Sequence, residues 1–163
     1  MGKGFALKKG VMASNKKWIL TCDIDFAANP KEILTWQNKK YISSTDLCYF
    51  GSRNLEYSNI KYKFYRKFIG NIFSYLRNSY LKLELRDTQC GFKLYPRNIA
   101  RSVFSKLTSF GYIHDVEICI LLKRKNVRIK ELPIKWKHVN NSKLNIFIDG
   151  SKMMFQLLLL KFR

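Results

Sequence analysis

The stretch Trp18-Ile19-Leu20-Thr21-Cys22-Asp23-Ile24-Asp25-Phe26 decides how the fold of this sequence is interpreted. It opens with an apolar run of strand length, since a helix would need a longer amphipathic pattern. Asp23 and Asp25 follow where this strand should end, and alternate strand residues point the same way. Two converging carboxylates at the carboxyl end of a strand suit a hard divalent cation, Mg²⁺ or Mn²⁺. Taken alone, the pair is more often a polar turn, because short motifs recur by chance.

Length, composition and charge restrict the class of protein. The chain has 163 residues, of which 47% are apolar, enough for one domain with a core and too apolar for a disordered chain. Lys and Arg number 31 against 11 Asp and Glu, which gives a formal net charge of +20. Such a charge predicts an anionic partner: a nucleic acid, a phosphorylated substrate or an acidic membrane surface. A lysine-rich coding bias would also produce part of this charge.

The four cysteines show no metal-binding spacing. Even the closest pair, Cys22 and Cys48, is far apart in the chain, so no Cys-x-x-Cys motif exists. Their apolar contexts predict reduced, buried thiols in a cytosolic protein. The sequence starts without the apolar core of a signal peptide, and no apolar run approaches the roughly 20 residues that span a bilayer.

Hydrophobic periodicity predicts further helices and strands. We expect helices over residues 31–40, 60–81, 99–107 and 118–122, and strands over 47–50 and 127–136. In the first of these helices, Ile33, Leu34 and Trp36 should face inward. The helix over 60–81 is basic and amphipathic, which is typical of a core-packed helix and also of a helix in a membrane interface.

Polar residues gather near several expected strand and helix ends. Arg53 follows the second strand, where a surface arginine is equally expected. Gly2-Lys3-Gly4 would let the backbone approach a phosphate, but it is too short for a Walker loop. Asp115 and Glu117 open an apolar helix, where carboxylates also stabilise the helix dipole. His114 is expected to be a structural neighbour of these acids.

Several stretches together resemble one family. They are GKGFALKKGVMAS, DID, YFGSR, RKFIGNIFSYL, RDTQCGFKLY, FGYIHDVEI and IKELPIKWKHVNNSK. Their order and spacing resemble the family-2 glycosyltransferases that load sugars onto polyprenyl phosphates, most closely the dolichyl-phosphate β-glucosyltransferase subgroup. The resemblance runs from Gly2 to about Lys152, and DTQCGFK is its most specific part.

The resemblance implies an α/β fold of the GT-A type, the Rossmann-like fold of nucleotide-diphospho-sugar transferases. Members of the family begin with an extra strand–helix–strand unit that grips the uracil and ribose, and this sequence starts just after it. We therefore expect a parallel sheet that lacks its first strands, with residues 1–150 forming the C-terminal part of such a domain. Residues 151–163 are expected to add a short amphipathic helix. A separate chain supplying the N-terminal half would complete the fold.

The resemblance also implies a reaction and a location. The reaction is a metal-dependent, inverting transfer of a hexose, most often glucose, from a UDP-sugar to a polyprenyl or dolichyl phosphate. The metal is Mg²⁺ or Mn²⁺. The location is the cytoplasmic face of a membrane, to which the protein attaches peripherally, with the helix around Phe68 to Leu76 resembling one that docks on the surface. No nucleic-acid partner is expected from this resemblance.

Roles carry over to individual residues. Asp23 and Asp25 match the Asp-x-Asp motif that holds the metal and the donor diphosphate. Gly2, Lys3 and Gly4 match a loop beside the donor nucleotide. Asp87 matches an acid proposed as general base, although an acceptor phosphate is already anionic and an orienting role fits as well. Positions matching the acceptor-phosphate site are Arg53, Arg66, Ser142 and Lys143. Further active-site candidates are Gln89, Lys93, Asp115, Glu117 and Trp136.

Two other functions stay open at the sequence level. One is a catalytically inactive remnant of such an enzyme that keeps its basic helices and binds a membrane surface. The other is a basic nucleic-acid-binding module, motivated by the charge of +20 and the 15% of aromatic residues. Against the second, residues 91–95 lack the aromatic spacing of an RNA-recognition strand, and the basic residues spread along the whole chain.

Overall fold

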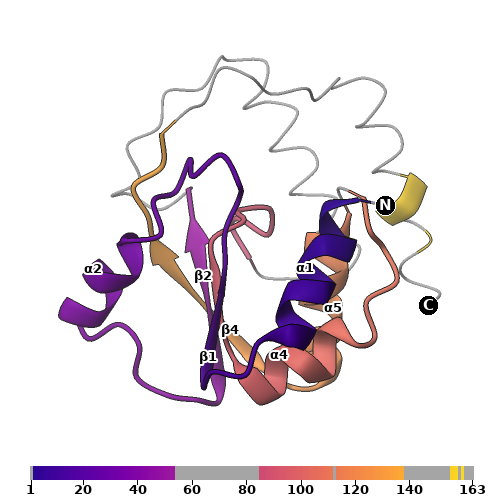
Figure 1. Cartoon of the computed structure of the whole chain (residues 1–163), viewed down its shortest axis with the longest axis horizontal. Coiled ribbons are helices and arrows are strands. Elements are labelled where there is room, and N and C mark those ends of the chain that lie inside the picture. The colour runs from indigo at the N-terminus through magenta and orange to yellow at the C-terminus, as the bar shows by residue number, and fades with distance from the viewer. Residues whose placement is uncertain (1, 54–84, 112, 138–154, 158, 160–163) are drawn as a thin grey trace.

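The computed structural model describes residues 2–53, 85–111, 113–137, 155–157 and 159. Its elements are α1 (Lys3–Ala13), β1 (Trp18–Thr21), α2 (Glu32–Asn38), β2 (Leu47–Ser52), β3 (Lys93–Pro96), α4 (Arg97–Phe104), α5 (His114–Arg124) and β4 (Arg128–Pro133). These helices and strands pack together as an α/β fold (Figure 1). The predicted helix over 60–81 lies outside the described residues, as do Arg66, Ser142 and Lys143.

The four strands form one mixed sheet in the order β1-β3-β2-β4. Strand β3 is antiparallel to both β1 and β2, whereas β2 and β4 are parallel. We expected a parallel sheet, and this prediction is wrong. Strand β3 runs opposite to β1 and β2, which lie on either side of it and run in the same direction. This inversion brings the carboxyl ends of β1, β2 and β4 to the same edge of the sheet as the amino end of β3.

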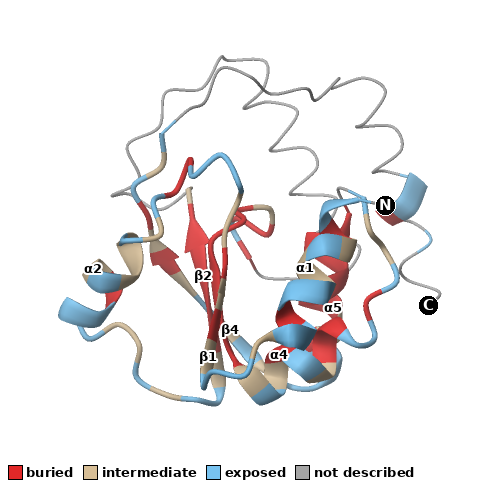
Figure 2. Ribbon diagram, in the orientation of Figure 1, coloured by how far each residue is buried: buried red, intermediate tan, exposed pale blue. Residues whose placement is uncertain are grey.

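Helices cover both faces of the sheet and make three layers, with α1, α4 and α5 on one face and α2 on the other (Figure 1). The alternation of side chains along each strand supplies both layers. In β2, Cys48 and Phe50 join the core cluster under α4 and α5, whereas Tyr49 joins the cluster under α2. Burial is accordingly greatest in β2, β3 and α5, whereas β4 is mostly half-buried or exposed (Figure 2).

Helix α2 packs on the sheet through one large side chain. Trp36 is fully buried, and its indole Nε1 donates a hydrogen bond to the carbonyl of Pro133 at 3.0 Å. Leu34 is 53% exposed, so the prediction that it faces inward is wrong, and Ile33 is half-buried. The reason is geometric, because residues two positions apart lie about 200° apart around a helix axis. A seven-residue helix that buries Trp36 must therefore turn Leu34 outward.

Other predicted elements are confirmed with shifted bounds. The helices expected over 99–107 and 118–122 begin earlier, at Arg97 and His114, and the strand expected over 127–136 is β4. Residues 155–157 are helical, and Leu157 packs in the core cluster with α4 and α5. The division of the chain at residue 150 stays a prediction. None of the helices in the described ranges is both long and apolar enough to cross a bilayer.

Candidate functional site

Four segments meet at one edge of the sheet, which we call the site edge. They are residues 22–26 after β1, Arg53 after β2, residues 85–92 before β3 and residues 134–136 after β4. The segment before β3 contacts both of its neighbours, through Gly91 on the β1 side and through Asp87 on the β2 side. The two halves of the site edge are therefore joined by one short stretch of chain.

Asp23 and Asp25 lie in a turn beyond β1. The strand ends at Thr21, and the N–H of Phe26 donates to the carbonyl of Asp23 at 3.1 Å, closing the turn. The carboxylate of Asp25 folds back to accept the N–H of Ala27 at 3.0 Å. The expectation that strand alternation aligns the two carboxylates is therefore wrong, although both stay at the carboxyl end of β1, where we expected them.

The carboxylate of Asp23 is held between a charge and a backbone. On one side it forms an ion pair with the ammonium group of Lys3, at the start of α1. On the other side it lies against Gly91, where an added Cβ would overlap both carboxylate oxygens. The hydroxyl of Thr21 donates to the carbonyl of Gly91 at 3.1 Å and so fixes that backbone. A side chain at position 91 would therefore displace the Asp23 carboxylate from this place.

Close packing accounts for the two glycines beside Lys3. The N–H of Gly4 donates to the carbonyl of Phe110 at 3.0 Å. A Cβ at Gly4 would lie 2.8 Å from the carbonyl oxygen of Ser109, and a Cβ at Gly2 would overlap the carbonyl oxygen of Phe110. The glycines thus let α1 begin directly on this loop, which sets the place of Lys3. Their role beside a nucleotide stays a prediction.

Asp87 and Arg53 form a buried pair in which the carboxylate is saturated with donors. It accepts the backbone N–H and the Nε and Nη2 of Arg53 at 3.1, 2.7 and 3.0 Å, and the N–H groups of Gln89 and Cys90, both at 3.1 Å. Burial alone would raise the pKa of Asp87, but the hydrogen bonds and charge of Arg53 outweigh it and lower the pKa. A carboxylate this well satisfied is suited to orient an arginine, not to remove a proton.

The guanidinium of Arg53 lies over the ring of Trp136, with Cζ 5.7 Å from the ring centroid. Trp136 is in turn placed by a β-bridge to Ala28, next to the N–H of Lys137, which donates to the carbonyl of Ala27 at 2.7 Å. The structure thus brings Trp136 and Arg53 into contact, although they lie far apart in the sequence. A guanidinium held by a carboxylate and an aromatic face has little rotational freedom.

Lys93 and Asp115 form an ion pair in the interior behind the site edge. The Nζ of Lys93 contacts Asp115 Oδ1 and donates to the carbonyl of Thr88 at 2.9 Å. Burial opposes the charged form of Lys93, but the carboxylate of Asp115 outweighs it and the pKa is raised. His114 Nε2 lies 3.3 Å from Asp115 Oδ2, and burial lowers the pKa of His114. These contacts tie β3 and the carbonyl of Thr88 to α5, and the roles of Lys93 and Asp115 at the active site stay predictions.

Glu117 also binds backbone away from the helix that carries it. Its carboxylate accepts the N–H and hydroxyl of Thr108 at 3.0 and 2.8 Å and the N–H of Ser109 at 2.6 Å. The alternative that Asp115 and Glu117 merely cap α5 is therefore incomplete, because α5 has no side-chain cap hydrogen bond. Glu117 holds the loop on which α1 begins.

Sequence reasoning missed Glu131. Its two carboxylate oxygens accept the backbone N–H groups of Arg86 and Asp87 at 2.9 and 2.8 Å. Two sequence signals were present: Glu131 lies in the stretch IKELPIKWKHVNNSK that carries the resemblance, and it is the one acid in a strand whose other charged residues, Arg128 and Lys130, are basic. Its partners lie more than 40 positions away, so the pairing becomes visible only in the fold.

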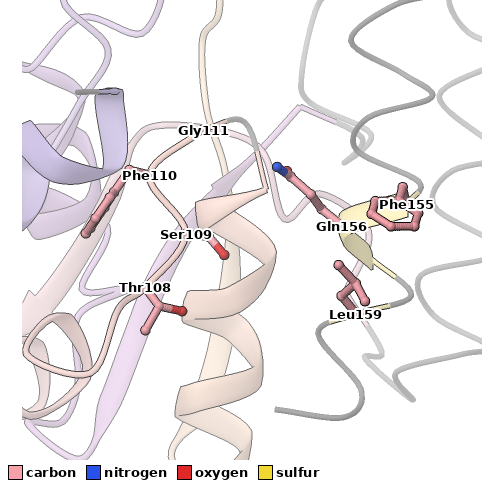
Figure 3. Close-up of a pocket in the computed structure, with 7 residues that line it drawn as sticks. All are labelled: Thr108, Ser109, Phe110, Gly111, Phe155, Gln156 and Leu159. Carbon is pink, nitrogen blue, oxygen red and sulfur yellow. The ribbon is translucent and has the colours of Figure 1, made fainter.

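A cavity of about 350 Å³ lies beyond the loop of residues 108–111. Figure 3 shows Phe155, Gln156 and Leu159 across the cavity from that loop. The large side chains that line it are mostly apolar, and the amide of Gln156 is a polar exception.

The candidate metal ligands are the two carboxylates of the turn. Asp23 and Asp25 offer the hard oxygen atoms that Mg²⁺ and Mn²⁺ prefer. Within the ranges that the structure describes, no three His, Cys, Asp or Glu side chains gather as a metal-binding group. The two aspartates would therefore depend on substrate oxygens or water to complete a coordination shell, as Mg²⁺ usually does.

No protein-family model matches the chain. It is 34% identical to the dolichyl-phosphate beta-glucosyltransferase of Saccharomyces cerevisiae, in an alignment that covers 98% of this chain and 52% of that protein. The proteins of the same name from Dictyostelium discoideum and Homo sapiens are 33% and 29% identical over 99% of this chain. The chain spans about half the length of the curated relatives it matches.

The fold is similar to that of a solved structure. Glucosyl-3-phosphoglycerate synthase from Mycobacterium tuberculosis, in complex with UDP, superposes with a TM-score of 0.67 over 98% of this chain and 55% of that chain. At 15% sequence identity, this likeness concerns the fold alone. The chain is therefore a relative of the dolichyl-phosphate beta-glucosyltransferases over nearly its whole length, and its fold is that of the GT-A glycosyltransferases.

Proposed function

We propose that this chain carries part of the active site of an enzyme that transfers a hexose, glucose in the first instance, from a UDP-sugar to a dolichyl or other polyprenyl phosphate. The names of the relatives supply the reaction. The observation that carries the proposal is that residues 87–91 join Asp23 to Arg53. A sugar transferase needs a group for the leaving diphosphate and a group for the attacking phosphate within reach of one sugar.

Asp23 and Asp25 form the donor side of the site in this proposal. They would hold a divalent cation, Mg²⁺ or Mn²⁺, and a cation bound there neutralises charge on a leaving diphosphate. Lys3 adds a second positive charge beside Asp23. Gly91 has no side chain, and the Asp23 carboxylate occupies the space that a Cβ at position 91 would fill. Gly2 and Gly4 let α1 begin where Lys3 reaches this carboxylate.

Arg53 forms the acceptor side. A guanidinium binds phosphate through two parallel hydrogen bonds, and Asp87 with the ring of Trp136 limits how this one can turn. The attacking oxygen of the acceptor phosphate is already anionic near neutral pH, so Asp87 orients Arg53 and no general base is needed. The acceptor oxygen bonds to the anomeric carbon as the bond to the diphosphate breaks, and this single displacement inverts the configuration. Arg66, Ser142 and Lys143 are proposed as further phosphate contacts.

Peripheral attachment to a membrane, on its cytoplasmic face, completes the proposal. In the C-terminal helical segment Leu157 is buried, whereas Phe155 and Leu159 are 63% and 44% exposed. Exposed apolar side chains next to basic residues suit the interface of an anionic bilayer. The formal charge of +20 acts in the same direction. We also propose that a separate chain is able to supply the half of the relatives' length that this chain does not match.

A transfer assay tests the function. The protein is incubated with UDP-glucose labelled in the sugar, Mn²⁺ and a polyprenyl phosphate in detergent micelles, and the lipid fraction is then extracted. We expect Mn²⁺-dependent label in the lipid. If the folded protein binds anionic vesicles but neither binds UDP nor transfers label, it is the inactive remnant. Salt-dependent binding of RNA, without transfer, would favour the nucleic-acid-binding alternative.

A further inference from the structure

The carboxylate of Glu131 accepts hydrogen bonds from two consecutive backbone N–H groups. Glu131 lies in β4, the neighbour of β2, and β2 is the strand that leads to Arg53. Within the sheet, Glu131 is paired with Phe50 of β2. Its Oε2 accepts the N–H of Arg86 at 2.9 Å and its Oε1 accepts the N–H of Asp87 at 2.8 Å. These two hydrogen bonds therefore connect β4 to the segment of residues 85–92, which contacts Arg53 at the end of β2.

The same segment carries the carboxylate that holds Arg53. Asp87 accepts three hydrogen bonds from Arg53 through its backbone N–H, Nε and Nη2. Glu131 fixes the backbone of Asp87, and Asp87 fixes the guanidinium. We infer that Glu131 is a positioning residue that orients the Arg53 guanidinium through Asp87. This inference rests on the proposed function only where it assigns Arg53 to the acceptor phosphate.

A carboxylate is the side chain that this task requires. It offers two acceptor oxygens and no donor, so each N–H receives its own oxygen. A glutamine has one acceptor oxygen, and its NH₂ group would face the second N–H. The change Glu131→Gln therefore keeps size and polarity and removes one of the two backbone hydrogen bonds. Glu131→Asp keeps the charge but shortens the reach, and it serves if the first variant folds poorly.

A spectroscopic readout tests the positioning directly. In amide and arginine ¹H–¹⁵N spectra of the full chain, Glu131→Gln should shift the Arg53 Nε–H signal and speed its exchange with solvent at least severalfold. The matched control is Asp46→Asn, whose carboxylate accepts the hydroxyl of Ser44 at 3.3 Å in the loop before β2, at the opposite edge of the sheet. The control should leave the Arg53 signal unchanged. An unaltered Arg53 Nε–H signal in Glu131→Gln or Glu131→Asp overturns the inference.

A binding readout separates positioning from the proposed function. Farnesyl phosphate, a short polyprenyl phosphate, is titrated into the same variants. We expect Glu131→Gln to weaken this binding about tenfold while UDP binding stays unchanged, and to add little further loss in an Arg53→Lys background. Equal losses for farnesyl phosphate and UDP would indicate general loosening and overturn the inference. A shifted Arg53 signal with unchanged farnesyl phosphate binding would support the inference and contradict the acceptor role of Arg53.

Discussion

The carboxylate of Asp23 lies against the backbone of Gly91, so closely that a Cβ at position 91 would displace it. This contact joins the turn after β1 to the segment that carries Asp87. It also makes the place of Asp23 dependent on a residue that has no functional group of its own. Small steric changes at position 91 should therefore act on donor binding before they act on stability.

Gly91→Ala tests this dependence. The added Cβ would overlap the Asp23 carboxylate, and that side chain can move away more easily than the backbone can. We expect Mn²⁺-dependent UDP binding to weaken by about tenfold or more, which corresponds to about 1.4 kcal/mol, with only a small change in Tm. The measurement is calorimetric titration of UDP, together with thermal unfolding.

Gly10→Ala is the matched control for this variant. Gly10 lies within α1 with no atom within 4 Å of an added Cβ. Alanine in a helix is favoured over glycine by about 1 kcal/mol, so this variant should be slightly more stable and bind UDP normally. Normal UDP binding by Gly91→Ala would contradict the role given to the Asp23–Gly91 contact.

The buried ion pair between Lys93 and Asp115 gives a second prediction. Lys93→Met should lower the free energy of unfolding by about 3–5 kcal/mol, because it leaves a buried carboxylate without its partner. The double variant Lys93→Met with Asp115→Leu should regain most of this loss, since no charge stays unpaired. Urea unfolding measures both. A double variant as unstable as the single one would show that the pair is not the source of the effect.

The pH dependence of stability gives a third prediction. Burial would raise the pKa of Glu117, but its hydrogen bonds to Ser109 and Thr108 outweigh this and lower the pKa below its unfolded value. The folded state therefore binds fewer protons than the unfolded state as this carboxylate titrates, so stability falls with falling pH. The loss should begin near the unfolded pKa of about 4.3 and continue as the pH falls through the lower folded value.

Glu117→Gln should be less stable than the natural sequence at pH 7 and should lose less stability between neutral pH and pH values below about 4. Thermal unfolding followed across this range measures both effects. A variant whose Tm falls as steeply in acid as that of the natural sequence would show that Glu117 does not supply the acid dependence.

The packing of α2 gives a fourth prediction. Trp36→Ala should cost about 3–5 kcal/mol, because the indole is fully buried and donates a hydrogen bond to Pro133. Leu34→Ala should change stability by no more than about 0.5 kcal/mol, since that side chain is largely exposed. Denaturant unfolding of both variants checks the difference. A large loss of stability in Leu34→Ala would contradict the outward orientation of this side chain.

Local patterns in the sequence predicted most of what local interactions determine. The apolar run Trp18-Ile19-Leu20 predicted β1, and the acids after it were correctly placed at its carboxyl end. The inversion of β3 between β1 and β2 could not be predicted, because strand order depends on long-range pairing. The prediction that strand alternation continues through Asp23 and Asp25 was wrong for a local reason. The strand ends at Thr21, and the turn that follows no longer alternates.

For the candidate site, the sequence singled out individual residues, and only the fold shows which of them contact one another. Motif resemblance singled out Arg53 and Asp87 separately, but only the fold shows that they contact each other. Lys93 and Asp115 were singled out separately as well, and the fold shows that they form an ion pair, while their role in the active site stays a prediction. Glu131 lies in a stretch that carries the resemblance, but no role was assigned to it, because its contacts depend on the register between β2 and β4.

The central claim is that the turn with Asp23 and Asp25 binds a nucleoside diphosphate through a divalent cation. The most direct measurement is calorimetric titration of UDP into the folded protein with Mn²⁺, repeated with a chelator and with Asp25→Asn. The account predicts binding with Mn²⁺, and its loss both with the chelator and in the variant. Equal UDP binding in all three conditions would contradict the claim, as would no binding by the folded natural sequence with Mn²⁺.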